Sequence, residues 1–276
     1  MAEPAAPRSP PNRIRIGRLW IDAVTQAQAL DRIAALVESG RGGSVFTPNV
    51  DHVVKAEDDP ALQAAYSRVS LSIADGQPLV WASRLLRAPL PERVAGSDLI
   101  YPLMQRAARN RWRVYLLGGG PSIGEQAAAR LRTDPGVEIA GVDAPVLSRE
   151  PTEAEEASIE RVRAARPHLV AVALGNPKQE MWIDRALPRI APAVCLGIGG
   201  SLDFIAGKVR RAPVWMRRAG LEWLLRLAQE PRRLARRYLW EDPKFLAILW
   251  RTRAEPRATR VQERATAQGF HTRQGA

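Results

Sequence analysis

Polar residues follow five short apolar runs in the sequence, and their side chains could handle a phosphorylated, hydroxyl-rich ligand. Carboxylates can take up protons, hydroxyls and amides can bind sugar hydroxyls, and glycine-rich loops can offer backbone N–H groups to phosphate. The five segments are Thr47-Pro48-Asn49, Ala74-Asp75-Gly76, Gly118-Gly119-Gly120-Pro121-Ser122, Gly175-Asn176-Pro177-Lys178-Gln179-Glu180 and Gly199-Gly200-Ser201-Leu202-Asp203.

Asp75 is the strongest single candidate for catalysis. It ends an apolar run and precedes Gly76, which permits close approach of a ligand or of another backbone segment. A partly desolvated carboxylate there could take a proton from a sugar hydroxyl, although it could instead only cap the next helix. Thr47 and Asn49 flank Pro48 and could bind hydroxyl groups, while Asn49 also suits a helix N-cap.

Two glycine-containing segments favour a nucleotide or phosphate over a simple turn. Gly118, Gly119 and Gly120 join an expected strand to a helix, where backbone N–H groups could meet phosphate. The segment is neither G-x-G-x-x-G, because position 123 is Ile, nor a P-loop. Farther along, Asp203 could hold ribose hydroxyls or could cap a helix.

The segment from 175 to 180 carries more functional groups than a turn requires. Its Gly and Pro suffice for the turn, so the Lys, Gln and Glu at the following helix start need another reason. Gln179 could read the edge of a sugar or of uracil, and Lys178 could meet a phosphate. We therefore expect both residues to face a ligand.

Apolar run, polar loop and helix repeat along the chain, which predicts a parallel α/β sheet. Ligands of such sheets bind at the carboxyl ends of the strands, so the five segments should converge on one crevice. The fold class is a Rossmann-like, mostly parallel sheet flanked by helices. The expected strands are Arg13–Ile21, Ser44–Phe46, Val69–Ala74, Arg113–Leu117, Val137–Val142, Leu169–Leu174 and Ala193–Ile198.

The C-terminal part is strongly basic. From Lys208 onward there are 17 Lys or Arg against 6 Asp or Glu, a net +11 of the chain's +12, together with four of its eight tryptophans. An Arg-rich amphipathic region suits an anionic membrane surface, and arginines suit phosphate. The phosphate candidates are Arg226, Arg233 and Arg236. A solvated helix face packed on the domain is the other interpretation.

This break in composition suggests four parts. Residues 1–12 and 254–276 are expected to be disordered, 13–207 to form the α/β catalytic core, and 208–253 to form a helical basic appendage near a membrane. No run is long and apolar enough for a spanning helix, and no signal peptide is recognisable, so we expect a soluble or peripheral protein.

Composition gives no sign of a bound metal or redox cofactor. The single Cys195 lies in an apolar run and reads as a buried strand residue, and the three histidines lack paired ligand spacing. No D-x-D triplet occurs, which weakens a mechanism based on a metal-held diphosphate. We expect no cofactor.

From about Ile14 to Phe245, the chain resembles the WecG/TagA/CpsF glycosyltransferases, bacterial enzymes of cell-surface polysaccharide and wall-polymer synthesis. The resemblance rests on a series of motifs in a fixed order. Besides the segments at 47, 74, 175 and 197–200, they are Glu92-Arg93-Val94-Ala95-Gly96, Arg211-Ala212-Pro213-x-Trp215-Met216, Gly220-Leu221-Glu222-Trp223 and Glu230-Pro231-x-Arg233.

The resemblance implies inverting, metal-independent transfer of a sugar from a UDP-sugar to a polyprenyl-diphosphate-linked sugar at the cytoplasmic membrane face. N-acetylmannosamine, its uronic acid and glucose are the candidate sugars, and a homo-oligomer is compatible with the family. Asp75 falls on the family's proposed base and Asp203 on its UDP-contacting acid. The other implied site residues are Thr47, Asn49, Arg93, Gln179, Arg226, Arg233 and Arg236.

One segment departs from the family pattern. Family members often carry a Gly-Tyr-Phe-like segment after the strand ending at Val142, whereas this chain reads Asp143-Ala144-Pro145-Val146. The packing of uracil and the donor sugar therefore stay open.

Two other function classes fit parts of the sequence but leave other parts unexplained. An NAD(P)-dependent Rossmann-like oxidoreductase is disfavoured because no G-x-G-x-x-G follows a strand with an acid about 20 residues on. A nucleic-acid-binding protein could use the basic tail, but this leaves the strand-end segments unexplained. We expect no nucleic-acid partner.

Overall fold

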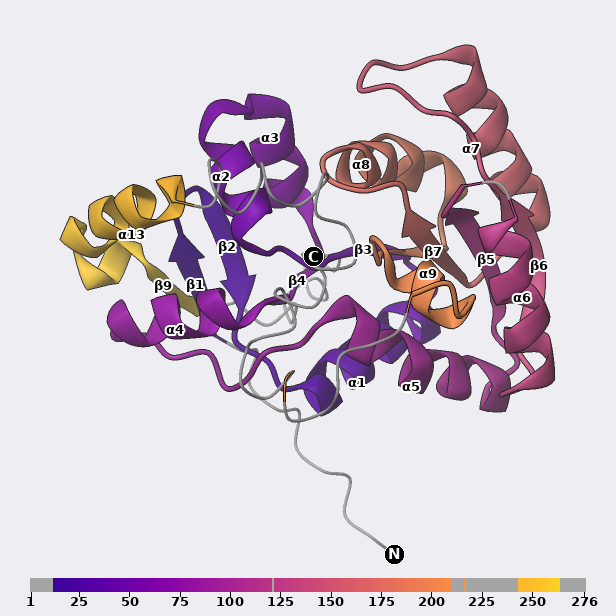
Figure 1. Ribbon diagram of the computed structural model, residues 1–276, viewed down its shortest axis with the longest axis horizontal. Coiled ribbons are helices and arrows are strands. Elements are labelled where there is room, and N and C mark those ends of the chain that lie inside the picture. Colours follow the sequence, from indigo (N-terminus) through magenta and orange to yellow (C-terminus); the bar gives the residue numbers. More distant parts are fainter. Residues whose placement is uncertain (1–11, 121, 210–215, 217–242, 264–276) are drawn as a thin grey trace, which may run out of the picture.

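A six-stranded, fully parallel sheet forms the centre of the protein (Figure 1). The computed structural model describes residues 12–120, 122–209, 216 and 243–263. Its strand order is β4-β3-β8-β7-β5-β6, which confirms the predicted Rossmann-like α/β class. The strands are β3 (Gly43–Phe46), β4 (Leu71–Ser72), β5 (Arg113–Gly118), β6 (Glu138–Asp143), β7 (Leu169–Ala173) and β8 (Val194–Gly197).

Helices cover both faces of this sheet, and each face has its own apolar cluster. The strands alternate their side chains between the two clusters, as pleating requires. Helices of one face are α1 (Gln26–Glu38), α5 (Gly96–Arg109), α6 (Ile123–Thr133) and α9 (Ser201–Ile205). Those on the other side are α2 (Val50–Asp58), α3 (Pro60–Arg68), α7 (Glu153–Ala165) and α8 (Lys178–Ile190). Helix α4 (Gln77–Leu85) lies apart from them, against β1 (Asn12–Ile16).

A second, antiparallel sheet lies at one end of the molecule, in the order β2-β1-β9 (Figure 1). The single strand predicted for Arg13–Ile21 was wrong: it is a hairpin of β1 (Asn12–Ile16) and β2 (Leu19–Asp22). Gly17 makes the turn with a φ of 60°, a value that glycine adopts readily. Ile14, Ile16, Leu19 and Ile21 are all buried.

The C-terminal segment adds the third strand to this small sheet. Residues 254–263 do not follow the expected disorder, because η2 (Arg257–Thr259) leads into β9 (Val261–Glu263), which pairs with β1. Asn12, placed in the N-terminal segment, is the first residue of β1. Pairing satisfies backbone groups that would otherwise leave β1 as an open edge.

Helix α13 (Lys244–Ala254) also belongs to the packed structure. Phe245, Ile248 and Leu249 join the same apolar cluster as α2 and the β1–β2 hairpin, and the Gly17 N–H donates to Thr252 Oγ1 at 3.0 Å. The expected boundary near Gly207 is therefore not the end of the packed fold. Residues 210–215 and 217–242 lie outside the described residues.

Several local predictions can be compared with the structure. Cys195 is buried, and burial raises the pKa of its thiol to about 12. Thr152 caps α7, its side chain accepting from the Glu155 N–H, and the Glu155 side chain does not complete a capping box. Its carboxylate instead receives two hydrogen bonds from Arg185, at 2.6 and 2.7 Å. Among the described residues, none belongs to a helix long and apolar enough to cross a membrane.

Candidate functional site

The segments after β3 and β4 lie side by side at the carboxyl edge of the sheet. The Asp75 N–H donates to the Pro48 carbonyl at 2.7 Å, and the Val94 N–H donates to the Ala74 carbonyl at 2.9 Å. These backbone bonds tie the Thr47–Asn49 segment, Asp75 and the Arg93 segment into one group. The convergence predicted for these residues therefore follows from the strand order and from direct bonds.

Arg93 places its guanidinium beside the start of α5. It forms an ion pair with Asp98 at 2.6 Å, and both side chains are largely buried at 16% and 15% exposure. This pairing fixes the direction of the Arg93 side chain next to the strand that ends at Asp75. It also neutralises part of the positive charge of the Arg93 guanidinium.

Thr47 joins this group to the segment after β8. Its buried hydroxyl donates to the Gly197 carbonyl at 3.0 Å. A Cβ added at Gly96 would lie 3.6 Å from Thr47 Oγ1 and 3.7 Å from Ser201 Oγ, so three elements meet there. Thr47 is thus both a candidate ligand contact and a tie between neighbouring strand ends.

Asn49 is the N-cap of α2, as predicted. Its Oδ1 accepts from the Asp51 N–H at 3.0 Å, and its own N–H donates to His52 Nδ1 at 2.9 Å. Capping therefore explains part of the choice of Asn at this position. The sequence signal for this role of His52 is its position three residues after an N-cap, which is the usual one for a reciprocal capping partner.

The Gln179 side chain is hydrogen-bonded within the protein at the carboxyl edge of the sheet and does not project freely from it. Its Oε1 accepts from the Gly199 N–H at 3.1 Å, and its Nε2 donates to Glu180 Oε1 at 2.6 Å. The side chain is 2% exposed. In this state both ends of the amide hold the segments after β7 and β8 together.

Lys178 and the segment after β6 contact each other. Lys178 Nζ donates to the Leu147 carbonyl at 2.7 Å, whereas a phosphate contact was expected for this ammonium group. Asp143 pairs with Arg161 at 2.7 Å. Leu147 is buried, whereas the preceding Val146 is 92% exposed. The segment after β6 is therefore packed against the protein at Leu147 and exposed at Val146.

The glycine segment after β5 adopts a conformation that requires glycine. Gly118, Gly119 and Gly120 have φ values of 99°, 79° and 78°, and α6 begins at Ile123. The Gly119 N–H donates to the Ala173 carbonyl at 3.0 Å, so this donor holds β7. A Cβ at Gly120 would meet nothing within 4 Å of the described residues. Among the three glycines of this segment, Gly120 therefore has the most open space beside it in the described part of the chain.

Gly118→Ala should destabilise the fold by roughly 2–5 kcal/mol, from overpacking and from strain at positive φ. The added Cβ would lie 2.4 Å from the Ala173 carbonyl oxygen. Gly120→Ala is the matched control and should cost only the strain, about 1–2 kcal/mol. Urea unfolding of both variants measures the difference. Equal losses would contradict the close packing of Gly118 on β7.

Asp203 lies on α9, at the same carboxyl edge. A Cβ at Gly200 would be 3.6 Å from Asp203 Oδ2, and the Asp203 carbonyl accepts from the Lys208 N–H at 3.0 Å. The acid is partly exposed. Its neighbour Leu202 lies beside the glycine segment, with Cδ1 3.3 Å from a Cβ added at Gly119.

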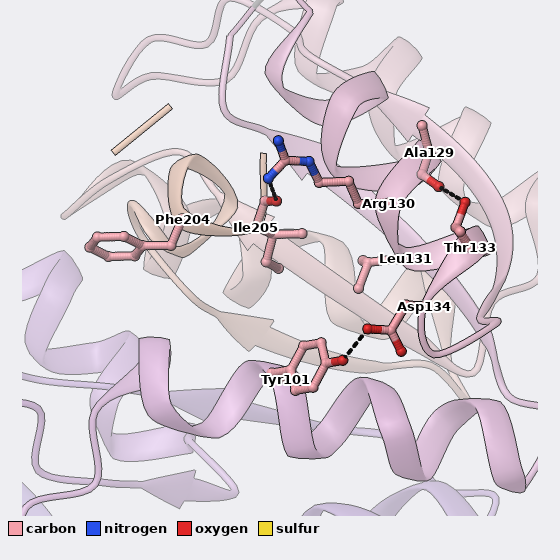
Figure 2. Close-up of a pocket in the computed structure, with 8 residues that line it drawn as sticks. All are labelled: Tyr101, Ala129, Arg130, Leu131, Thr133, Asp134, Phe204 and Ile205. Carbon is pink, nitrogen blue, oxygen red and sulfur yellow. Dashed lines mark hydrogen bonds between the residues drawn. The ribbon is translucent and has the colours of Figure 1, made fainter. Parts of the chain in front are cut away.

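A cavity of about 560 Å³ opens beside this position, between α5, α6 and α9 (Figure 2). Tyr101 donates to Asp134 at 2.6 Å across one side, and Arg130 donates to the Ile205 carbonyl at 3.1 Å. The cavity lining contains none of the strand-end candidate residues. It borders Phe204, the neighbour of Asp203.

Some predicted residues cannot be placed. Arg226, Arg233 and Arg236 lie outside the described residues. In the part of the chain that the structure describes, no group of three or more His, Cys, Asp or Glu could hold a metal ion. The described candidate residues are thus the Asp75 carboxylate, the Gln179 side-chain amide, the glycine segment 118–120 and Asp203.

Fold and site together define a Rossmann-like α/β protein with polar residues at the carboxyl ends of its parallel strands, where ligands of such sheets bind. A sequence model described as the glycosyl transferase WecG/TagA/CpsF family matches residues 14–259, the bulk of the chain. The chain belongs to this family. It is a glycosyltransferase of cell-surface polysaccharide synthesis, which confirms the predicted family.

Proposed function

We propose that this glycosyltransferase transfers a hexosyl group, with inversion, from a UDP-sugar to a lipid-diphosphate-linked sugar. One observation carries the proposal: backbone bonds place Asp75 beside Pro48 and Ala74 beside Val94, at the edge that also bears the glycine segment and Asp203. An acid and hydrogen-bonding side chains thus lie on one side, and a phosphate-type loop lies on the other. The candidate sugars remain N-acetylmannosamine, its uronic acid and glucose.

In the proposed step, the acceptor hydroxyl oxygen attacks the anomeric carbon of the donor. Its proton passes to the Asp75 carboxylate, the bond from the anomeric carbon to the phosphate oxygen breaks, and UDP departs with the electron pair. Thr47 and Asn49 orient the acceptor, and Gln179 contacts the sugar after a rearrangement of its internal bonds. The positions of these four residues at the carboxyl edge of the sheet support the roles proposed for them.

The nucleotide occupies the other half of the crevice in this proposal. Gly118, Gly119 and Gly120 lie against the pyrophosphate, and Asp203 accepts from the ribose hydroxyls. Arg93 stabilises the charge that builds on the departing UDP, together with Arg226, Arg233 and Arg236 from the tail. No metal or other cofactor takes part in the proposed transfer.

The enzyme works at the inner face of the cytoplasmic membrane in this proposal. Trp81 and Leu85 on α4 are 52% and 46% exposed, and Leu246 and Trp250 on α13 are 70% and 76% exposed. Each pair is spaced four residues apart and so shares one helix face. Exposed Trp and Leu beside basic side chains suit an anionic lipid surface, which also carries the acceptor.

A donor screen tests the function directly. Purified enzyme is mixed with a panel of UDP-sugars and a short-chain lipid-diphosphate sugar, and both UDP release and glycosylated product are measured. We expect one donor to give acceptor-dependent UDP release with matching product. Absence of acceptor-dependent transfer with every donor, alongside tight binding of NAD or salt-sensitive binding of nucleic acid, would reject the proposal.

A further inference from the structure

A series of buried polar residues lies at the carboxyl edge of the sheet. Two of them, His52 and Glu180, have no role in the proposed step. His52 on α2 and Glu180 on α8 are 4% and 0% exposed. His52 Nε2 lies 3.5 Å from Glu180 Oε1, and His52 Nδ1 accepts from the Asn49 N–H at 2.9 Å. Buried polar groups of this kind are costly unless they are satisfied, so their arrangement is informative.

The bonding pattern fixes the state of the His52 ring. Nδ1 accepts from a backbone N–H, so it carries no proton. The proton of the neutral ring then sits on Nε2, which lies 3.5 Å from Glu180 Oε1 and has no hydrogen-bond partner among the described residues. His52 thus joins the Asn49 backbone on one side to a buried acid on the other.

Two side-chain amides donate to the Glu180 carboxyl group. It receives hydrogen bonds from Gln179 Nε2 at 2.6 Å and from Asn176 Nδ2 at 3.1 Å, besides facing His52. It also lies in the first turn of α8, where the helix dipole favours negative charge. Burial, followed by the charges of Glu180 and Asp51, raises the pKa of the neighbouring Tyr66 phenol well above its usual range.

We propose that His52 and Glu180 are positioning residues that hold Asn49 and Gln179 in register across the active site. The path runs from the Asn49 N–H through His52 and Glu180 to the Gln179 amide, and ends at the Gly199 N–H. It links the segments after β3, β7 and β8. The inference rests on the proposed function, since it matters only if Asn49 and Gln179 meet the substrates.

A local role is the competing explanation, because His52 also completes a capping box with Asn49. A cap alone would contribute to the stability of α2, by about 1 kcal/mol, and would leave turnover per folded molecule unchanged. The contact with Glu180, which belongs to a helix more than 100 residues away, is not part of a cap. Kinetics on folded protein therefore separate the two roles.

Three variants of the full-length enzyme test the proposal. His52→Leu removes both ring nitrogens, and Glu180→Gln removes the buried charge at nearly constant shape. We expect each to lower kcat by about 10- to 100-fold, the scale of a small misplacement of reacting groups, with little change in the Kd for UDP. His52→Gln can accept from Asn49 and donate to Glu180, so it should restore most of the turnover.

Tyr66→Phe is the matched control. The Tyr66 ring stacks edge-on against His52, with ring centroids 6.4 Å apart, and its buried hydroxyl has no partner among the described residues. Its removal should leave kcat unchanged. Circular dichroism and urea unfolding establish the folded fraction of each variant, and rates are normalised to it.

A double-mutant cycle with Asn49→Ala decides between the outcomes. If His52 acts through Asn49, His52→Leu should lower kcat far less in the Asn49→Ala background than in the wild type. Equal losses in both backgrounds, or normal turnover of folded His52→Leu and Glu180→Gln, would overturn the inference alone. Full activity of Asn49→Ala would instead remove Asn49 from the proposed function, and the inference with it.

Discussion

Asp75→Asn should lower the turnover of sugar transfer by about 10²–10⁴-fold, the usual contribution of a general base. Asn is nearly isosteric but cannot accept the proton of the attacking hydroxyl. The backbone bond from the Asp75 N–H to Pro48 would persist, so the segment should keep its place. Single-turnover measurement with saturating donor and acceptor isolates the chemical step from product release.

Binding of UDP provides the control for this variant. The glycine segment and Asp203 follow other strands, β5 and β8, so calorimetry should give a Kd for UDP within a few-fold of the wild type. Asp31→Asn, at an exposed carboxylate on α1 that pairs with Arg106, should retain full turnover. Near-normal turnover of Asp75→Asn would show that Asp75 is not the general base. A lost affinity for UDP would instead show that Asp75 belongs to the nucleotide-binding site.

The parallel sheet could be predicted because its signals are local. Each strand is a short apolar run followed by a turn and an amphipathic helix, and these patterns persist whatever the neighbouring strands do. The β1–β2 hairpin was missed although the phase of its alternation changes at Gly17-Arg18. Strand β9 gave no local signal, because three residues become a strand only by pairing with β1 at the other end of the described chain.

The candidate site, like the fold, could be predicted from the sequence only in part. Asp75, Asn49 and the glycine segment could be chosen from the sequence because residue type and position after a strand limit what each can do. The bonds that occupy Gln179 and Lys178 could not be foreseen, since Glu180, Gly199 and the Leu147 carbonyl become their partners only in the folded chain. His52 reads as an isolated histidine until α8 brings Glu180 beside it.

Helix α13 should show two separable functions on its two faces. Ile248 is 6% exposed and packs in the core cluster, so Ile248→Ala should destabilise the fold by about 2–4 kcal/mol. Leu246 and Trp250 are 70% and 76% exposed, so replacing both with Ser should leave the unfolding free energy nearly unchanged. The buried face thus supports the fold, and the exposed face is available to a membrane.

The same variants should separate in a vesicle assay. Burying two large apolar side chains in a lipid interface is worth about 1.5–3 kcal/mol each, so the double Ser variant should bind anionic phosphatidylglycerol vesicles about 10²–10⁴-fold more weakly. Below its unfolding transition, Ile248→Ala should bind them as the wild type does. Neutral phosphatidylcholine vesicles and added salt measure the contribution of the basic residues. Unchanged vesicle binding by the double Ser variant would show that α13 does not face the lipid, and any membrane contact would then have to come from another surface.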